Sequence, residues 1–237
     1  MNPDPITRYL QRLPTLITFF FSIMLVNVFT KLSVLFNWST GPTFDFRILG
    51  HDLVAVSFLT TLFYVVSVWL AYCLLIERFP YSLDYTVFFF DVVRFSVLFA
   101  IFNFAFLAGI PPYYWYYIAA LGVYHLIMTI WHSNRLRFIQ SEERMERKAD
   151  IRGHLFRMST YFVLAILYYF LVALPWHVSP SWGLQAVFVI VTSVLVVVFN
   201  VRRLGEVQIK ALQAQEAAKS QQAATTQEPK KAAEPAR

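Results

Sequence analysis

Two charged side chains, Asp91 and Arg94, lie within an apolar segment that is long enough to cross a lipid bilayer. This segment, residues 85–110, reads YTVFFFDVVRFSVLFAIFNFAFLAGI. A charged side chain near the bilayer centre costs at least about 3 kcal/mol on insertion scales, so it persists only where it is paired, faces protein or water, or has a function. Because the two residues are three positions apart, they share one face of a helix. The sequence therefore predicts a polar point inside a membrane domain.

A third titratable side chain, His125, is expected at the same depth in the next apolar segment. At about 1.5 Å per helical residue, Asp91, Arg94 and His125 lie roughly 9, 13 and 12 Å from the same membrane surface. A carboxylate, a guanidinium and an imidazole in a low dielectric can form a proton relay or an ion site. They can also form an inert polar clasp, because an Asp–Arg pair neutralises itself and arginine can extend toward the interface. The sequence leaves both interpretations open.

Three further polar residues are expected at the periphery of the membrane domain. Lys31 lies near the end of the first apolar segment, where its ammonium group can reach the interface. Asp52 precedes the second segment, where a carboxylate favours a helix N-terminus. His132 ends the fourth segment on the same helical stripe as His125. Each has a structural explanation, with ion or proton entry as the alternative.

The sequence contains no motif that specifies catalysis, a metal or a cofactor. Its single cysteine, Cys73, excludes an internal disulfide framework and a cysteine-rich metal site. Neither Gly-x-Ser-x-Gly nor His-Glu-x-x-His spacing occurs. A haem held by two histidines is disfavoured, since His125 is the one histidine expected at depth. We therefore expect no catalytic residues, no metal and no cofactor, and an enzyme is the least favoured class.

The composition indicates the class of fold that positions these polar residues. Apolar residues make up 58% of the chain and charged residues only 14%, whereas soluble domains are roughly a quarter charged. The apolar residues come in blocks of about 20, the length needed to span a bilayer as a helix. The first block is too long for a secretory signal and lacks a small-residue cleavage site. The sequence therefore predicts an all-α, polytopic membrane protein.

Six transmembrane helices are expected, and they can form three helical hairpins. The predicted spans lie within a membrane domain over residues 13–203 and cover residues 13–35, 53–76, 86–108, 113–132, 155–174 and 182–200. The remaining segments are predicted to be a cytoplasmic N-terminus (1–12), a charged helical loop (133–153), a helix (204–224) and a disordered tail (225–237).

The distribution of basic residues predicts the orientation. Of the 20 Lys and Arg residues, 17 lie before the first span, between the second and third, from Arg135 to Arg157, or after the sixth. Basic residues concentrate in cytoplasmic loops, so both termini are expected in the cytoplasm. We expect the protein in a bacterial inner membrane.

Two functions fit these observations. The first is a small ion, proton or solute channel or transporter with Asp91, Arg94 and His125 in its polar layer. The alternative is a non-enzymatic membrane scaffold or assembly subunit that docks partners through its charged loop and C-terminal helix. The expected partners are the lipid bilayer and further copies of the chain or other subunits of a membrane complex. Nucleic acid is not expected, because binding it would require more net positive charge and fewer acids than the charged loop has.

The orientation can be tested by cysteine labelling in a Cys73→Ser background. Cysteines introduced at Ser39 or Ser179 should react with a membrane-impermeant thiol reagent added to intact cells. A cysteine at Ser141 should react only after the cells are opened, because basic residues hold that segment inside. Labelling of Ser141→Cys in intact cells would contradict the six-span orientation.

Overall fold

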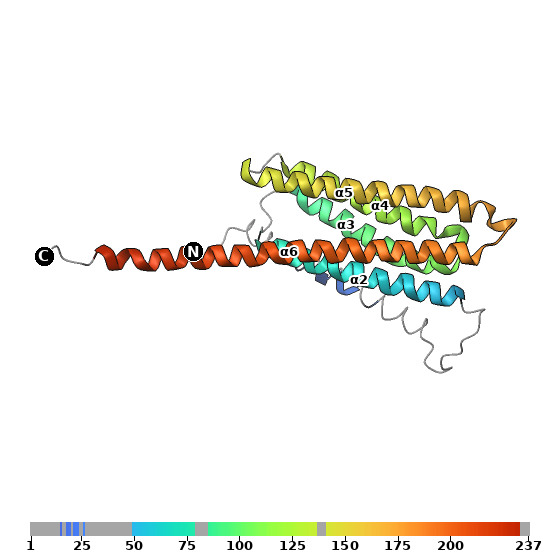
Figure 1. The fold of residues 1–237 in the computed structure, drawn as a ribbon, viewed down its shortest axis with the longest axis horizontal. Coiled ribbons are helices and arrows are strands. Elements are labelled where there is room, and N and C mark those ends of the chain that lie inside the picture. Colours follow the sequence, from blue (N-terminus) through green and yellow to red (C-terminus); the bar gives the residue numbers. More distant parts are fainter. Residues whose placement is uncertain are drawn as a thin grey trace, which may run out of the picture.

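The described part of the chain folds into a bundle of long helices (Figure 1). The computed structural model describes residues 49–78, 85–136 and 141–232, together with a few positions between 15 and 26. These residues contain no strand. The α-helices among them are α2 (Leu49–Arg78), α3 (Tyr85–Phe104), α4 (Trp115–Arg135), α5 (Ser141–Tyr168) and α6 (Trp182–Ala232). The prediction of an all-α protein is confirmed for this part of the chain.

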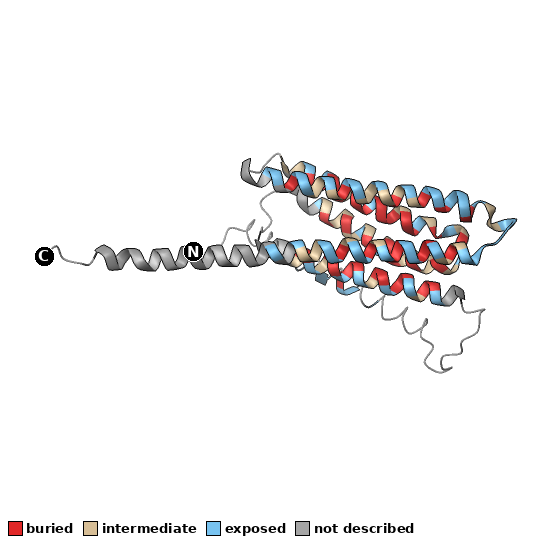
Figure 2. Cartoon of the chain, in the orientation of Figure 1, coloured by how far each residue is buried: buried red, intermediate tan, exposed pale blue. Residues whose placement is uncertain are grey.

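Four segments within these helices are long and apolar enough to cross a membrane. They are Asp52–Cys73, Phe89–Gly109, Arg147–His177 and Trp182–Glu206. Their outward faces carry large exposed apolar side chains such as Phe63, Phe99 and Ile190, and Figure 2 shows exposed residues along the outer sides of the bundle. Contiguous exposed apolar surface of this extent is typical of a protein surrounded by lipid. These features are those of an integral membrane protein.

The two other predicted spans are not among these four segments. Residues 13–35 lie mostly outside the described part, although Phe21 is buried and its ring stacks on Trp69 of α2 at 4.4 Å. The span predicted at residues 113–132 corresponds to α4, whose tyrosines, tryptophans and histidines make it less apolar than the four segments above. The total of six spans therefore stays a prediction.

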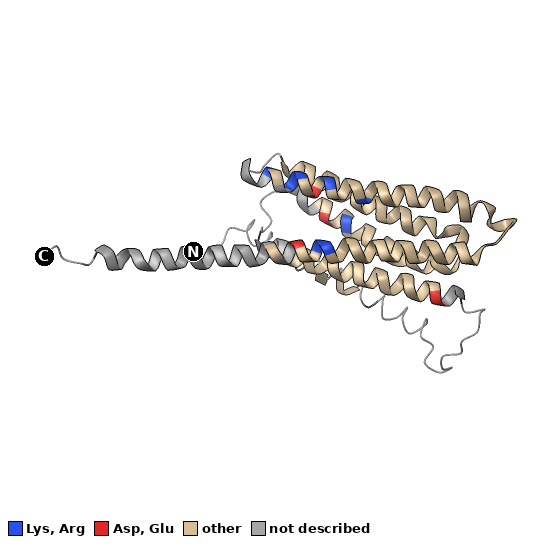
Figure 3. Ribbon diagram, viewed as in Figure 1, with Lys and Arg blue, Asp and Glu red and all other residues tan. Residues whose placement is uncertain are grey.

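The bundle has two chemically different ends. We call the end where α3 and α5 begin the charged end, because most described Lys, Arg, Asp and Glu residues gather there (Figure 3). Asp52, in the first turn of α2, lies at the other end. That turn end contains short 3₁₀ turns, Ala105–Gly109, Pro111–Tyr113 and Pro175–His177, and a π-helical turn, Tyr169–Ala173. Exposed Tyr113, Tyr116 and Trp182 lie there, as expected at a membrane interface.

Two boundaries differ from those inferred from the sequence. The charged helical loop expected at residues 133–153 is not separate from the fifth span, because from Ser141 onward it forms the first part of α5 without a break. A helix can begin outside the membrane and continue into it, because its backbone hydrogen bonds are internal throughout. Likewise α6 continues to Ala232, beyond residue 225 where disorder was expected. Ala, Gln, Glu and Lys, which dominate this part, all favour helix.

Several hydroxyl and amide side chains inside the apolar helices are satisfied locally. Each donates to the carbonyl oxygen four residues earlier, at 2.6–2.9 Å. The residues concerned are Thr61, Ser67, Thr129, Thr192 and Asn200. Such bonds let a polar side chain reside in an apolar helix without a partner on another helix. The buried tyrosines, histidines and arginines cannot be satisfied in this way, so their positions carry more information.

Helices α4 and α5 approach each other closely at Gly122. A Cβ atom at this position would lie 3.1 Å from the ring of Phe162, whereas one at Gly153 of α5 would have no neighbour within 4 Å. We therefore expect Gly122→Val to lower the free energy of unfolding by about 1–3 kcal/mol through overpacking.

Gly153→Val is the matched control, because it carries the same β-branched penalty without the contact. Thermal unfolding of both variants in detergent measures the difference. Equal stability of the two would show that the α4–α5 contact tolerates separation at this point.

Candidate functional site

Asp91 and Arg94 form an ion pair in the interior of the bundle. Their side chains are 3% and 2% exposed, and Arg94 Nη1 lies 3.7 Å from Asp91 Oδ1. Both project from one face of α3, as their spacing of three residues requires. The two residues are placed together, as expected. Removing two charges from water is compensated only when each finds further partners, so their surroundings decide what the pair can do.

Three aromatic rings enclose Arg94. We call these three rings and Arg94 the arginine cage. Its guanidinium carbon lies 5.5–5.9 Å from the ring centroids of Tyr72, Phe95 and Tyr124. Arg94 Nε also donates a hydrogen bond to the Tyr124 hydroxyl at 3.1 Å. Cation–π contacts strengthen when the cation is desolvated, which offsets part of the penalty for burying it. The cage fixes the guanidinium between α2, α3 and α4.

A row of polar side chains follows the contact between α4 and α5. The nearest pair is His125 and His154, whose Nδ1 atoms are 3.0 Å apart, so one ring donates to the other. Next toward the charged end, Arg147 Nη1 lies 3.5 Å from His132 Nδ1. The ring of Tyr161 stacks on His125, with centroids 5.6 Å apart. We call these five residues the polar seam; all are buried.

The three histidine rings of the polar seam lie in a row in space and do not surround a common centre. The centroid of the His154 ring is 5.2 Å from that of His125 and 5.2 Å from that of His132. Among the described residues, no group of three His, Cys, Asp or Glu side chains could hold a metal ion. The arrangement is suited to passing a proton from ring to ring, since imidazole can accept at one nitrogen and donate from the other.

The arginine cage and the polar seam meet at Tyr124 and His125. These residues are neighbours in α4, and their ring centroids are 5.4 Å apart. Tyr64 of α2 packs edge-on against Tyr124, with ring centroids 5.6 Å apart. Farther toward the turn end, the Tyr117 hydroxyl and Thr61 Oγ1 lie 2.8 Å apart. Polar groups therefore extend along the interior from the charged end past the middle of α4.

Some polar atoms here are buried without a hydrogen-bond partner. Within the described part of the chain they include Arg94 Nη2, the Tyr64 hydroxyl and the Tyr161 hydroxyl. Leaving a buried donor unsatisfied costs about 1–3 kcal/mol. Native proteins hold few such groups, and each calls for a reason such as a functional role or a bound water or ion. An inert structural clasp in which every polar atom had a partner would contain no such unsatisfied atoms.

The other residues singled out from the sequence have separate positions. Asp52 is exposed at the turn end, far along α2 from the arginine cage. Lys31 lies outside the described residues. His132, expected at the periphery, is buried within the polar seam against Arg147 and His154.

Three residues of the seam were not singled out from the sequence. Arg147, His154 and Tyr161 follow one another at intervals of seven residues in α5, and Tyr168 continues the series. All four side chains are buried. Residues seven apart share one helix face, so this spacing is the signal that could have identified them.

Comparison of the chain with protein-family models, curated proteins and solved structures finds no match. The geometry of the site is therefore the basis on which its function is inferred.

The Asp91–Arg94 pair can be tested for its contribution to stability. Asp91→Asn should lower the free energy of unfolding by about 3–5 kcal/mol, because it leaves a buried guanidinium without its counter-charge. The double variant Asp91→Asn with Arg94→Gln should regain much of this loss, and a double-mutant cycle measures the coupling.

The exposed pair Arg202–Glu206, with side chains 77% and 51% exposed, provides the control. The corresponding changes there should have little effect. Equal small effects at both pairs would show that Asp91 does not stabilise Arg94.

Proposed function

We propose that this membrane protein moves protons, alone or together with a small solute, through the polar seam and the arginine cage. The observation that carries the proposal is the direct hydrogen bond between His125 and His154, 3.0 Å long and buried in the bundle. Charged and titratable groups inside a membrane are costly and are typically found on ion pathways and proton relays. The unsatisfied donors Arg94 Nη2, Tyr64 and Tyr161 support transport over an inert clasp.

The chemistry of one transfer follows from the two rings. An incoming proton binds Nε2 of the ring that donates through Nδ1, which makes that ring an imidazolium. Its Nδ1–H bond then breaks as the Nδ1 lone pair of the second ring takes this proton. The second ring releases a proton from its own Nε2, so one proton enters and one leaves. His132, with its ring 5.2 Å from that of His154, extends the path toward the charged end.

Arg94 would act as a fixed charge in this pathway. Its Nη1 lies 3.7 Å from Asp91, and its aromatic cage holds it in place. A buried cation repels every cation at short range, protons included, but Asp91 neutralises Arg94, so the pair leaves the seam open to protons. We place the charged end on the cytoplasmic side, because basic residues concentrate there.

A second function, docking of a membrane-complex partner, is favoured by one feature. Helix α6 continues from Glu206, where its apolar span ends, to Ala232, about 40 Å at the rise of a regular helix. Figure 1 shows this part extending beyond the rest of the bundle. A projecting helix of this length offers a long surface to a second chain. Docking and proton transfer involve separate parts of the molecule and are compatible.

Proton transfer can be measured with purified protein in liposomes that hold a pH-sensitive dye. His125→Gln and His154→Gln should each lower the proton flux at least about tenfold, since glutamine keeps the hydrogen bonding but does not exchange protons near neutral pH.

His177→Gln is the matched control, because His177 is exposed at the turn end. It should leave the flux unchanged. Wild-type protein without flux, or equal flux in all variants that retain their thermal stability, would refute proton transport through the seam.

A further inference from the structure

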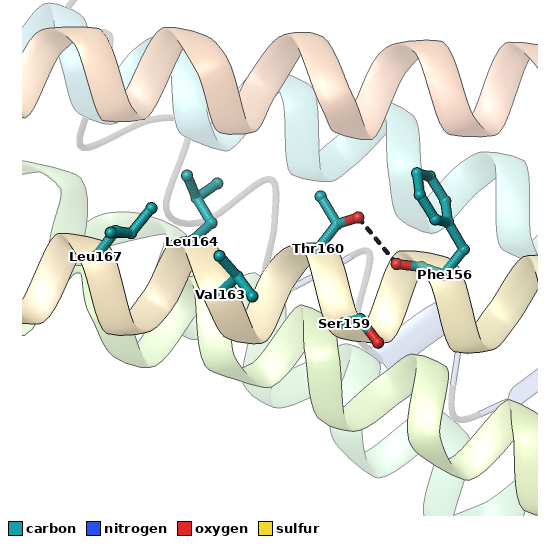
Figure 4. A pocket seen from close by; sticks show the side chains of 6 residues that line it. All are labelled: Phe156, Ser159, Thr160, Val163, Leu164 and Leu167. Atoms are coloured by element: carbon teal, nitrogen blue, oxygen red, sulfur yellow. Dashed lines mark hydrogen bonds between the residues drawn. The ribbon is translucent and has the colours of Figure 1, made fainter.

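An apolar groove runs along α5, lined by residues other than those of the polar seam. It has a volume of about 390 Å³ and is lined by Phe156, Ser159, Thr160, Val163, Leu164 and Leu167. In Figure 4 the side chains of Phe156, Thr160 and Leu164 extend from α5 toward α6. The Thr160 hydroxyl donates to the carbonyl oxygen of Phe156 at 2.9 Å, so it presents its methyl group to the groove. The groove therefore offers an apolar lining within a predicted span.

The length of the groove matches one lipid acyl chain. From Phe156 to Leu167 the helix rises about 16 Å at 1.5 Å per residue. The hydrocarbon core of a bilayer is about 30 Å thick, so each leaflet, and each chain within it, occupies about half of that. A second helix would need a longer face than this groove provides, because a span requires about 20 residues.

Basic side chains lie at the end of the groove nearest the charged end. The guanidinium of Arg157 lies over the ring of Phe199 in α6, 5.6 Å from its centroid, and Phe199 also contacts Phe156 of the groove. Arg203 of α6 lies within electrostatic range of Arg157. The acid near them, Glu206, bonds Arg202 at 3.2 Å. This leaves an excess of positive charge where the apolar groove begins.

We propose that the groove binds an anionic phospholipid, with one acyl chain along α5 and the phosphate between Arg157 and Arg203. Two like charges on helices that contact each other through Phe156 and Phe199 are stabilised by an anion between them, and arginine binds phosphate oxygens through paired N–H groups. Basic pockets between transmembrane helices bind anionic headgroups in this way. The apolar groove and the basic residues thus belong to one site. This proposal is independent of proton transport.

Native mass spectrometry of the detergent-solubilised protein can test the site. The protein is titrated with phosphatidylglycerol and with phosphatidylcholine of identical acyl chains. We expect tighter binding of phosphatidylglycerol. The double variant Arg157→Gln with Arg203→Gln should bind it about thirty-fold more weakly, near the level of phosphatidylcholine.

The control is Arg144→Gln with Arg152→Gln, which removes the same charge from exposed positions of α5. It should keep the preference for phosphatidylglycerol. Equal binding of the two lipids by the wild type, or an equal loss in both double variants, would overturn the proposal.

The acyl chain is tested separately by filling the groove. Leu164→Trp should weaken both lipids, whereas Val187→Trp, at an exposed position of α6, should weaken neither. Thermal unfolding identifies variants that keep the fold. If Leu164→Trp binds normally while inorganic phosphate displaces the lipid, the arginines bind a headgroup alone and the groove is not part of the site.

Discussion

The bundle depends on covering the polar face of α4. This helix carries tyrosines, histidines and tryptophans that lipid cannot satisfy, and its inward residues are almost fully buried. It packs against α3 on one side and α5 on the other. An unpaired polar group in hydrocarbon costs several kcal/mol, so the helices that supply its partners are fixed in position by that requirement. The apolar spans of α5 and α6 expose their other faces outward.

The partners that α4 finds are of two kinds. On the α3 side they are a guanidinium and aromatic rings around Tyr124, and on the α5 side they are an imidazole and an arginine. In an apolar environment helices gain little from burying hydrophobic surface against one another, so packing and interhelical hydrogen bonds determine which faces meet. Gly122 adds to this by allowing the ring of Phe162 to approach the α4 backbone.

The all-helical fold and the burial of Asp91 and Arg94 could be predicted from the sequence. Apolar blocks of about 20 residues have few alternatives to helix in a membrane, and a spacing of three residues places two side chains on one face whatever the neighbouring helices do. His125 was expected at the same depth from helix length alone, and it lies beside Tyr124, which bonds Arg94.

The partners of His125 could not be found in the same way. Residues 133–153 are rich in charge, and that composition suggests a helical loop that ends where the apolar residues begin. The structure instead continues one helix from Ser141 through Tyr168, so Arg147 and His154 belong to the same face as Tyr161. A boundary drawn by composition separates residues that a continuous helix aligns. Packing between helices decides which face of α5 contacts α4. This packing cannot be read from the residues of α5 alone.

The proposed lipid site and the polar seam are connected through electrostatics. Arg157 and Arg203 lie within electrostatic range of both His125 and His154. In a medium of low dielectric such interactions act over many ångströms and are screened little by salt. An anion bound between the two arginines would reduce the positive potential at the histidines, while its acyl chain would occupy the space between α5 and α6. A lipid bound at this site would thereby influence the protonation of the polar seam, with no movement of the backbone required.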